Sequence, residues 1–470
     1  MKIKANSAAA FALMTGAMLV TSCANDVETD INADPTGNAL NFAPAVGHST
    51  RATETDVTNL GDFAVVARGI HHDGIAYQSY LIGDEAAGEI ATRVSLASDN
   101  KSGTWKLSRN VYWPSTLEKV MFFGYTTLKN GESSTNGVLG NATFGHDVNN
   151  NPVIGGFQPL KATAFDGSGI WADGQTQKDL VIAFTETTKT INVPLQFTHA
   201  LTQISIKAAQ HEKLDNDNRI VKIKGAWIVN AAHKKDLTVS VGHDSNKKPV
   251  VTKSWAAPSG ETLTTTTYGS FYNDPITLET DKDNKPAKDI LRSSLMLIPE
   301  DLTAWDCKSS NSNNGAYILL LCRVELEHNG TTHDQDANME DIGVNEALKK
   351  HYHQLFPENT QKYNANEYGF ACVPLSSTWA TDGMGKHYTY ILNICGNGAG
   401  AGKYPPMSAS ELSALIPTDA TNTTAVTTIP SGKNVGDNVL DEPIQFSVTV
   451  SDWSTETDSS WTDGTKVGKI

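Results

Sequence analysis

Short strand-like runs dominate this chain, and they limit the folds that it can adopt. Large apolar side chains alternate with polar or small ones in runs such as Leu195–Ile206 and Ile444–Val450, and Gly, Asn and Asp turns separate the runs. This two-residue period is typical of half-buried strands, whereas runs with the 3.6-residue period of a helix are scarce. We therefore expect an all-β protein built from antiparallel β-sandwiches, with short helices confined to loops.

Two segments are expected to be those helices. The first is Asn345–Leu355, and the second is Ser408–Leu415, where Glu411 follows Ser408 at the spacing of a capping box. In a helix, His351 and His353 of the first segment would point apart, because residues two positions apart lie on different sides. We therefore expect no metal site there.

Length and charge narrow the function classes. The chain has 470 residues and a formal net charge of -15, which is spread along the sequence and disfavours a nucleic-acid or acidic-lipid partner. Two domains are expected, over residues 52–208 and 209–470. Because neither the G-x-S-x-G nor the H-E-x-x-H motif occurs, we expect no enzyme, no catalytic residue and no cofactor.

The N-terminus has the pattern of a bacterial lipoprotein signal. Lys2 and Lys4 precede the apolar run Ala8–Val20, which small residues and Cys23 follow. That run is too short to cross a bilayer, which needs about 20 residues. Residues 1–22 are therefore expected to be removed and Cys23 to carry lipid, of the palmitate type, at the cell outer membrane. The alternative is an ordinary secretory signal with an incidental cysteine.

A strand is predicted shortly after this signal. Leu40, Phe42, Pro44 and Val46 alternate with smaller residues, so that the larger side chains share one face. Because Pro44 cannot donate a ladder hydrogen bond, we expect an edge strand or a strand that pairs on one side only. The polar loop that follows contains a single arginine, Arg51, and is a ready protease site.

Four cysteines remain after Cys23: Cys307, Cys322, Cys372 and Cys395. Their spacing lacks the CxxC pattern of zinc sites. Cys372 and Cys395 lie in two strand-like runs that a turn separates, and Cys307 and Cys322 flank a loop in the same manner, so each pair is a candidate disulfide. Three pairings are open, and buried thiols are the alternative.

Several tryptophans have two interpretations. They either line a sugar-binding surface or pack inside the sandwiches, as aromatic residues in strands normally do. These tryptophans are Trp105, Trp113, Trp227, Trp379 and Trp453.

Three groups of runs together resemble the fimbrillin family of Bacteroides-type bacteria, the subunits of surface pili. They are Ser49–Ala52 with Leu60–Val65, Trp105 and Tyr112–Pro114 with Val120–Tyr125, and Asp179–Ala183 with Val193–Leu201. Later matches are Leu297–Pro299, Tyr388–Tyr390 and Phe446–Trp453. The acidic residues after Cys23 also resemble the tether that sends lipoproteins to the cell surface in this group.

The resemblance implies two transthyretin-like β-sandwich domains and assembly by strand exchange. A trypsin-like protease would cut between Arg51 and Ala52 and release residues 23–51 as a propeptide. The strand with Leu40, Phe42 and Val46 would then leave a groove, which a strand of another fimbrial subunit fills, in a homo- or heteropolymer.

The sequence does not decide which segment is the donor strand. Ile444, Phe446, Val448 and Val450 have the alternation that a donor needs, and the last stretch, 454–470, is the other candidate. If neither donates, the chain would be a tip or accessory subunit that only accepts a strand. The competing interpretation is a non-polymerising surface adhesin or glycan-binding lipoprotein that keeps its anchor and binds a host or bacterial surface ligand.

Overall fold

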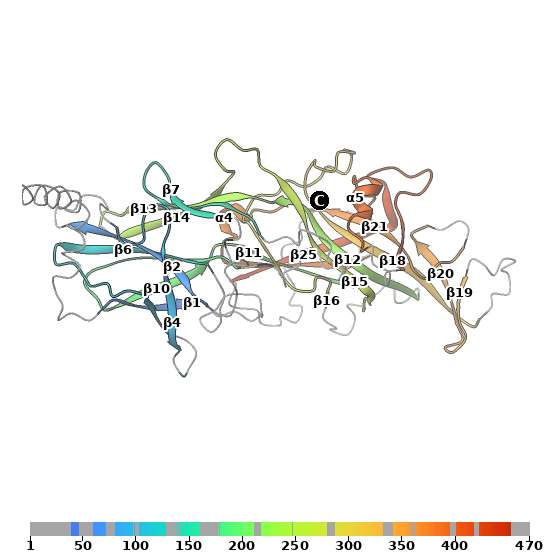
Figure 1. Cartoon of the computed structure of the whole chain (residues 1–470). Coiled ribbons are helices and arrows are strands. Elements are labelled where there is room, and N and C mark those ends of the chain that lie inside the picture. The colour runs from blue at the N-terminus through green and yellow to red at the C-terminus, as the bar shows by residue number, and fades with distance from the viewer. Residues whose placement is uncertain are drawn as a thin grey trace, which may run out of the picture.

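The protein is elongated, and nearly all of the regular secondary structure in its described part is β-strand, which confirms the predicted all-β fold class (Figure 1). This computed structural model describes residues 39–46, 60–71, 80–96, 98, 103–127, 139, 142–159, 177, 179–210, 218–246, 248–279, 287–331, 342–358, 362–394, 401–417 and 423–452. Within the described part, no helix is long and apolar enough to cross a membrane. The transthyretin-like, two-domain detail stays a prediction.

The first sheet has eight strands in the order β3-β2-β4-β5-β1-β10-β9-β6. Its members are β1 (Asn41–Val46), β2 (Phe63–His71), β3 (Tyr80–Ile82), β4 (Glu89–Leu96), β5 (Gly103–Leu107), β6 (Leu117–Thr126), β9 (Val181–Thr187) and β10 (Asn192–His199). β2 also pairs with β6, so all of these strands except β3 form a closed ring. One apolar cluster, which includes Phe63, Phe122 and Phe197, lies on the inner face of this ring.

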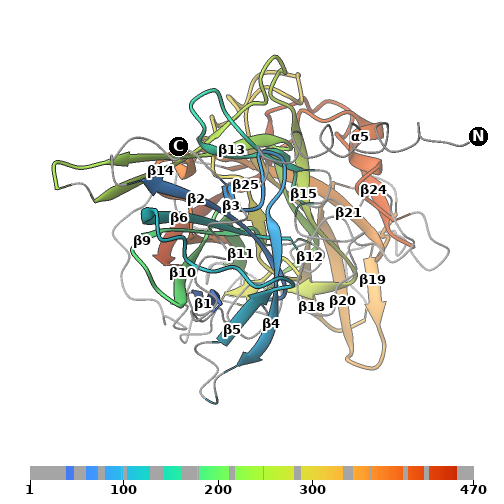
Figure 2. The same cartoon turned by 60° about the vertical axis from the view of Figure 1, so that its left-hand side comes forward.

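A four-stranded sheet, ordered β14-β13-β8-β7, covers the other face of the first sheet. Its strands are β7 (Thr143–His146), β8 (Pro152–Phe157), β13 (Lys235–His243) and β14 (Pro249–Ala256). Phe144 of β7 stacks on Tyr125 of β6 with ring centroids 4.9 Å apart, and Leu237 of β13 joins the same cluster. Figure 2 shows β13 and β14 reaching outward from the body of the molecule.

The third sheet has thirteen strands, which all lie within residues 202–452. They are β11 (Thr202–Gln210), β12 (Arg219–Ala232), β15 (Thr265–Thr277), β16 (Lys288–Asp289), β17 (Leu295–Leu297), β18 (Tyr317–Asn329), β19 (Ile342–Asn345), β20 (Lys350–Phe356), β21 (Glu367–Pro374), β22 (Lys386–Ile394), β23 (Ala401–Lys403), β24 (Ala425–Thr427) and β25 (Asn438–Asp452). Ile206 of β11 and Leu392 of β22 share one buried cluster with Ile228 of β12 and Leu320 of β18. The two ends of this sheet therefore enclose a single core.

The run 195–206, which looks like one strand in the sequence, is divided between two sheets. β10 ends at His199 in the first sheet, and β11 begins at Thr202 in the third. Ala200 and Leu201 between them are buried in the cluster under the four-stranded sheet. The chain thus changes sheets at 200–201, and the division into 52–208 and 209–470 stays a prediction.

The structure has two short helices in its described part, α4 (Trp379–Asp382) and α5 (Ala409–Ser413). The predicted capping box of α5 is confirmed. The Glu411 N–H donates to Ser408 Oγ at 3.3 Å, and the Ser408 N–H donates to the Glu411 carboxylate at 2.7 Å.

The predicted helix at Asn345–Leu355 is wrong, because this segment is a β-hairpin. β19 ends at Asn345, Lys349 has a left-handed φ of 53° that no α-helix accommodates, and β20 then pairs with β18. On a strand, His351 and His353 face the same side, and both rings lie about 5 Å from that of His328, with centroids 5.0 and 5.1 Å apart. Even so, the described residues contain no group of three or more His, Cys, Asp or Glu side chains placed to hold a metal ion.

A buried charge network ties β12, β18 and β20 together. Arg323 is 0 % exposed, and its Nε donates to Glu325 Oε1 at 2.6 Å while Nη1 donates to Gln354 Oε1 at 2.7 Å. Lys222 Nζ and the Tyr363 hydroxyl also donate to Glu325, at 2.5 and 2.8 Å. Burial alone raises the pKa of Glu325, but the charges of Arg323 and Lys222 outweigh it, so that this pKa is lowered.

Removing the arginine from this network should destabilise the C-terminal half strongly. Arg323→Met is expected to cost about 3–5 kcal/mol of unfolding free energy, because it takes one of two paired cations away from the buried Glu325 carboxylate. The double variant Arg323→Met/Glu325→Gln should lose less, which urea denaturation measures. Since the native pKa of Glu325 is below its unfolded value, the wild-type advantage is present above the ordinary Glu pKa and is lost as pH falls below it. Equal losses in both variants would contradict this account of the network.

Candidate functional site

β1 connects two strands of the ring that otherwise do not meet. It runs parallel to β10 over six residue pairs, from Asn41↔Asn192 to Val46↔Phe197, and antiparallel to β5 at the single pair Phe42↔Trp105. The predicted edge position is therefore wrong, since β1 lies between two strands. The prediction of one-sided pairing agrees better with the structure, because β1 is paired along its whole length only with β10.

Pro44 explains this uneven pairing. The N–H of Asn41 donates to Ile191 O on the β10 side, and the N–H of Leu40 donates to Val111 O on the β5 side, both at 2.8 Å. Successive residues of a strand direct their backbone groups to opposite sides, so the nitrogen of Pro44 faces β5. The nitrogen of Pro44 carries no hydrogen and cannot donate to β5. No ladder hydrogen bond is lost by this, because the pairing of β1 with β5 is limited to Phe42.

The side chains of β1 supply part of the ring's core. Phe42 is 0 % exposed and makes edge-to-face contacts with Phe63 and Phe122, at centroid distances of 6.1 and 6.2 Å. Leu40 is buried in the same cluster, and Val46 is partly buried against it. Leu40, Phe42 and Val46 thus lie on one face of β1, as the alternation predicts.

Without β1, the ring would be open along one side. β10 pairs with β9 only from Phe197 to His199, so β1 is the one strand in the described part that pairs with residues 192–196. Val193 and Leu195 of β10, with Trp105 of β5, would line the exposed floor. Such a groove combines unpaired backbone groups with an apolar floor, which is what an added strand requires.

The residues expected to control removal of β1 lie outside the described residues. They are Cys23, Arg51 and Ala52. Arg51 is the only lysine or arginine between Lys4 and Arg68. A trypsin-like cut that separates β1 from β2 can therefore occur only there.

The candidate donor run lies in β25 at the other half of the molecule. Nine residue pairs join it to β22, including Ile444↔Ile394, Phe446↔Leu392 and Val450↔Tyr388. β23, the other neighbour of β25, pairs only with Asn438 and Pro443. Among the described strands, residues 444–452 are therefore paired on one side. The other donor candidate, 454–470, lies outside the described residues.

The three cysteines that the structure describes, Cys307, Cys322 and Cys372, form no disulfide. Cys322 belongs to the core enclosed by the third sheet, whereas Cys307 and Cys372 belong to the cluster on the opposite face of β18 and β21. The predicted pairing of Cys307 with Cys322 is wrong for this reason. Burial raises the pKa of the Cys307 and Cys372 thiols, and Cys395 lies outside the described residues.

The tryptophans are packing residues wherever the structure describes them. Trp105, Trp227 and Trp379 are 0 % exposed, and Trp113 is 7 % exposed. These four side chains cannot line a sugar-binding surface. Trp453 lies outside the described residues.

Comparison with known proteins assigns this chain to a protein family. A family model described as Fimbrillin-like matches residues 50–314, more than half of the 470 residues. The chain belongs to the fimbrillin-like family. This membership indicates a fimbrial type of surface protein. A search of the curated proteins found no match.

Two solved structures are similar to this fimbrillin-like chain. A fimbrial protein from Bacteroides vulgatus ATCC 8482 is 15% identical, with 75% of this chain and 94% of that chain covered and a TM-score of 0.41. A fimbrial assembly protein from Parabacteroides distasonis ATCC 8503 is 10% identical, with coverages of 76% and 91% and a TM-score of 0.29.

Proposed function

We propose that this fimbrillin-like protein is a structural subunit of a surface fimbria that assembles by donor-strand exchange. The lipidated precursor is cut after Arg51, β1 leaves the ring, and a strand from another subunit replaces it. The observation that carries this proposal is the position of β1, which closes the ring between β5 and β10 and is joined to β2 through a segment with one trypsin-type residue.

The sequence of β25 supports a role as that replacement strand. Ile444, Phe446, Val448 and Val450 repeat the order and spacing of Leu40, Phe42, Pro44 and Val46, with one polar or small residue between each pair. A strand inserted parallel to β10 in this register would bring an aromatic side chain to the place of Phe42. Two copies of the chain would then be complementary, which favours a homopolymer.

A second form of the same function is an acceptor-only tip or accessory subunit. The nine-pair ladder between β25 and β22 favours it, because a donor must first give up those backbone hydrogen bonds. The two forms share the exchange of β1 and differ in whether β25 leaves its own sheet.

A peptide-capture experiment tests the exchange. The purified precursor and the protein cut at Arg51 are each titrated with a labelled peptide of residues 438–452, and binding is followed by fluorescence polarisation. We expect capture by the cut protein alone, and at least tenfold weaker capture of the Phe446→Ala peptide, because an alanine leaves the aromatic site empty.

The remaining outcomes are equally informative. A cut protein that recaptures a peptide of residues 39–46 but not 438–452 is an acceptor only. Equal binding to cut and uncut protein, or capture of neither peptide, contradicts strand exchange at the β1 position.

A further inference from the structure

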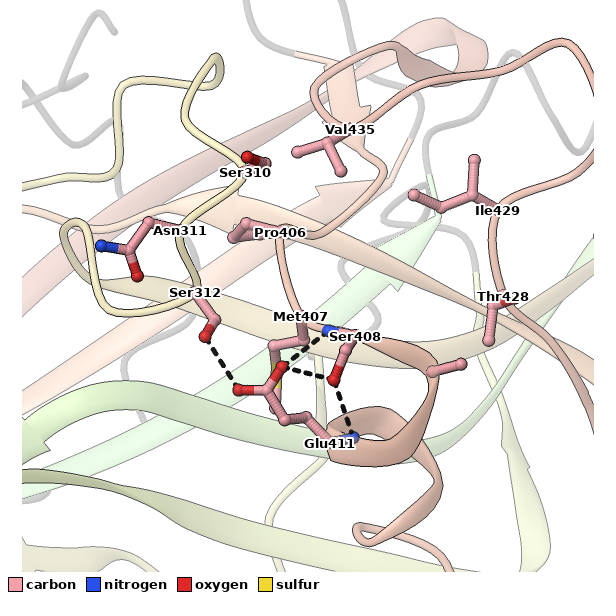
Figure 3. Close-up of a pocket in the computed structure, with 11 residues that line it drawn as sticks. Ser310, Asn311, Ser312, Pro406, Met407, Ser408, Glu411, Thr428, Ile429 and Val435 are labelled. Atoms are coloured by element: carbon pink, nitrogen blue, oxygen red, sulfur yellow. Dashed lines mark hydrogen bonds between the residues drawn. The ribbon is translucent and has the colours of Figure 1, made fainter.

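A cavity of about 460 Å³ lies beside α5 (Figure 3). Figure 1 shows α5 well away from β1 along the length of the molecule. Three separate segments form it: the loop before β18, the start of α5 and the turn after β24. Its volume is within the range of small-molecule sites. The lining residues are Ser310, Asn311, Ser312, Pro406, Met407, Ser408, Ala409, Glu411, Thr428, Ile429 and Val435.

The one charged group of this cavity is the Glu411 carboxylate, which its neighbours hold in place. Ser312 Oγ donates to Oε1 at 2.8 Å, and the backbone N–H and the hydroxyl of Ser408 both donate to Oε2 at 2.7 Å. Figure 3 shows these bonds converging on the carboxylate. Asn230 Nδ2 donates to the carbonyl oxygen of Ser312 at 2.6 Å, so the loop that carries Ser312 is itself anchored.

This negative charge has no cation within the described part of the chain. Hydrogen bonds from the Ser408 side chain and backbone lower the pKa of Glu411, so the carboxylate is ionised at neutral pH. None of the residues that line the cavity is basic, and the described ion pairs do not include Glu411. The carboxylate therefore keeps its capacity to bind an added cation.

The larger apolar residues of the lining are Met407, Ile429 and Val435. Met407 and Val435 pack against the cluster on the outer face of β18, and Ile429 packs against the inner core, but all three remain half-buried. They leave apolar surface within the same cavity as the carboxylate. The lining contains no aromatic ring, which a typical sugar-stacking site would use.

We propose that this cavity binds a primary ammonium on an aliphatic stem, the chemistry of a lysine side chain presented by another polypeptide. Glu411 binds the ammonium, and Met407, Ile429 and Val435 pack against the stem. Asn311 and Thr428, two polar residues of the lining outside the Glu411 network, offer hydrogen bonds to a peptide backbone, which a simple amine lacks. Strand exchange at β1 is not required for this binding, so either proposal can fail without the other.

The test uses the full chain and Nα-acetyl-lysine methylamide as the probe, with binding followed by saturation-transfer NMR. A ligand of this size is expected to bind at about millimolar concentration. The Nε-acetylated probe, which has no charge, should bind at least tenfold more weakly. n-Pentylamine should bind more weakly than the lysine probe, because it has no peptide groups for Asn311 and Thr428 to contact. Equal binding of the two would show that the site accepts amines in general and would overturn the proposal that the ammonium belongs to a polypeptide.

Two variants separate the charge of Glu411 from its structural role. Glutamine at this position preserves the capping box of α5, so Glu411→Gln removes the charge while the helix start remains. It should weaken probe binding at least tenfold, whereas Glu261→Gln, at an exposed carboxylate that pairs with Lys234 elsewhere, should leave binding unchanged. Unchanged binding in Glu411→Gln, equal binding of the two lysine probes, or no binding at all would overturn the proposal.

Discussion

Replacing Phe42 with alanine is expected to destabilise the uncut protein by about 3–5 kcal/mol, the usual cost of deleting a buried aromatic side chain. Phe42 has no exposed surface, and its ring contacts Phe63 and Phe122 inside the ring of strands. The cavity would form at the place where β1 is paired on both sides, so little neighbouring structure can collapse into it. The loss should also make β1 easier to release after a cut at Arg51.

Calorimetry of the purified precursor measures this effect, as a lower transition temperature of the unit that contains β1. The matched control is Ala43→Ser, because Ala43 lies on the same strand but faces away from the cluster and is half-buried. The control should change stability by less than about 0.5 kcal/mol. A loss below about 1 kcal/mol in Phe42→Ala would show that β1 contributes little to the ring, against the role given to it.

The alternation of residues 40–46 was enough to predict a strand and its buried face. The pattern could not predict that β1 lies between β5 and β10, because the sequence of a strand does not specify which distant strands it pairs with. Closure of the ring through β2 and β6 is equally non-local. Pro44 predicted an edge strand or pairing on one side only, whereas β1 pairs with β10 along its length and with β5 at one residue pair, because a proline constrains only its own backbone nitrogen.

Tertiary pairing also explains the predictions that were wrong. The segment around His351 contains good helix formers such as Leu348 and Lys349, yet pairing with β18 makes it a hairpin. Cys307 and Cys322 are close in sequence, but the sheet separates them onto its two faces. By contrast, the helix start at Ser408 depends on contacts three residues apart, and the sequence was sufficient to predict it.

The candidate site is likewise divided between local and non-local features. A candidate lipidation residue, Cys23, and a candidate cleavage residue, Arg51, could be proposed from the sequence, because proteases and lipid-transferring enzymes act on short segments. The groove that β1 would leave depends on Val193, Leu195 and Trp105, which the fold brings together. The cavity around Glu411 was missed for the same reason, since the fold brings Ser310–Ser312 to a helix start about a hundred residues later in the sequence.

Replacement of Arg51 is expected to have the largest effect of all, the loss of assembly. Because no other lysine or arginine lies between Lys4 and Arg68, Arg51→Ala leaves a trypsin-like protease no place to separate β1 from β2. β1 would then stay covalently tethered to the ring at a high effective concentration, and no strand from another subunit could compete with it. Arg51→Lys is the matched control, because trypsin-like proteases also cut after lysine.

Polymer formation by the purified precursor after limited trypsin treatment, combined with N-terminal sequencing of the product, is the most direct test of strand exchange. Wild type and Arg51→Lys should both give a new N-terminus at Ala52 and form polymers, while Arg51→Ala should stay uncut before β2 and monomeric. If Arg51→Ala polymerises as well as wild type, removal of β1 is not the step that starts assembly.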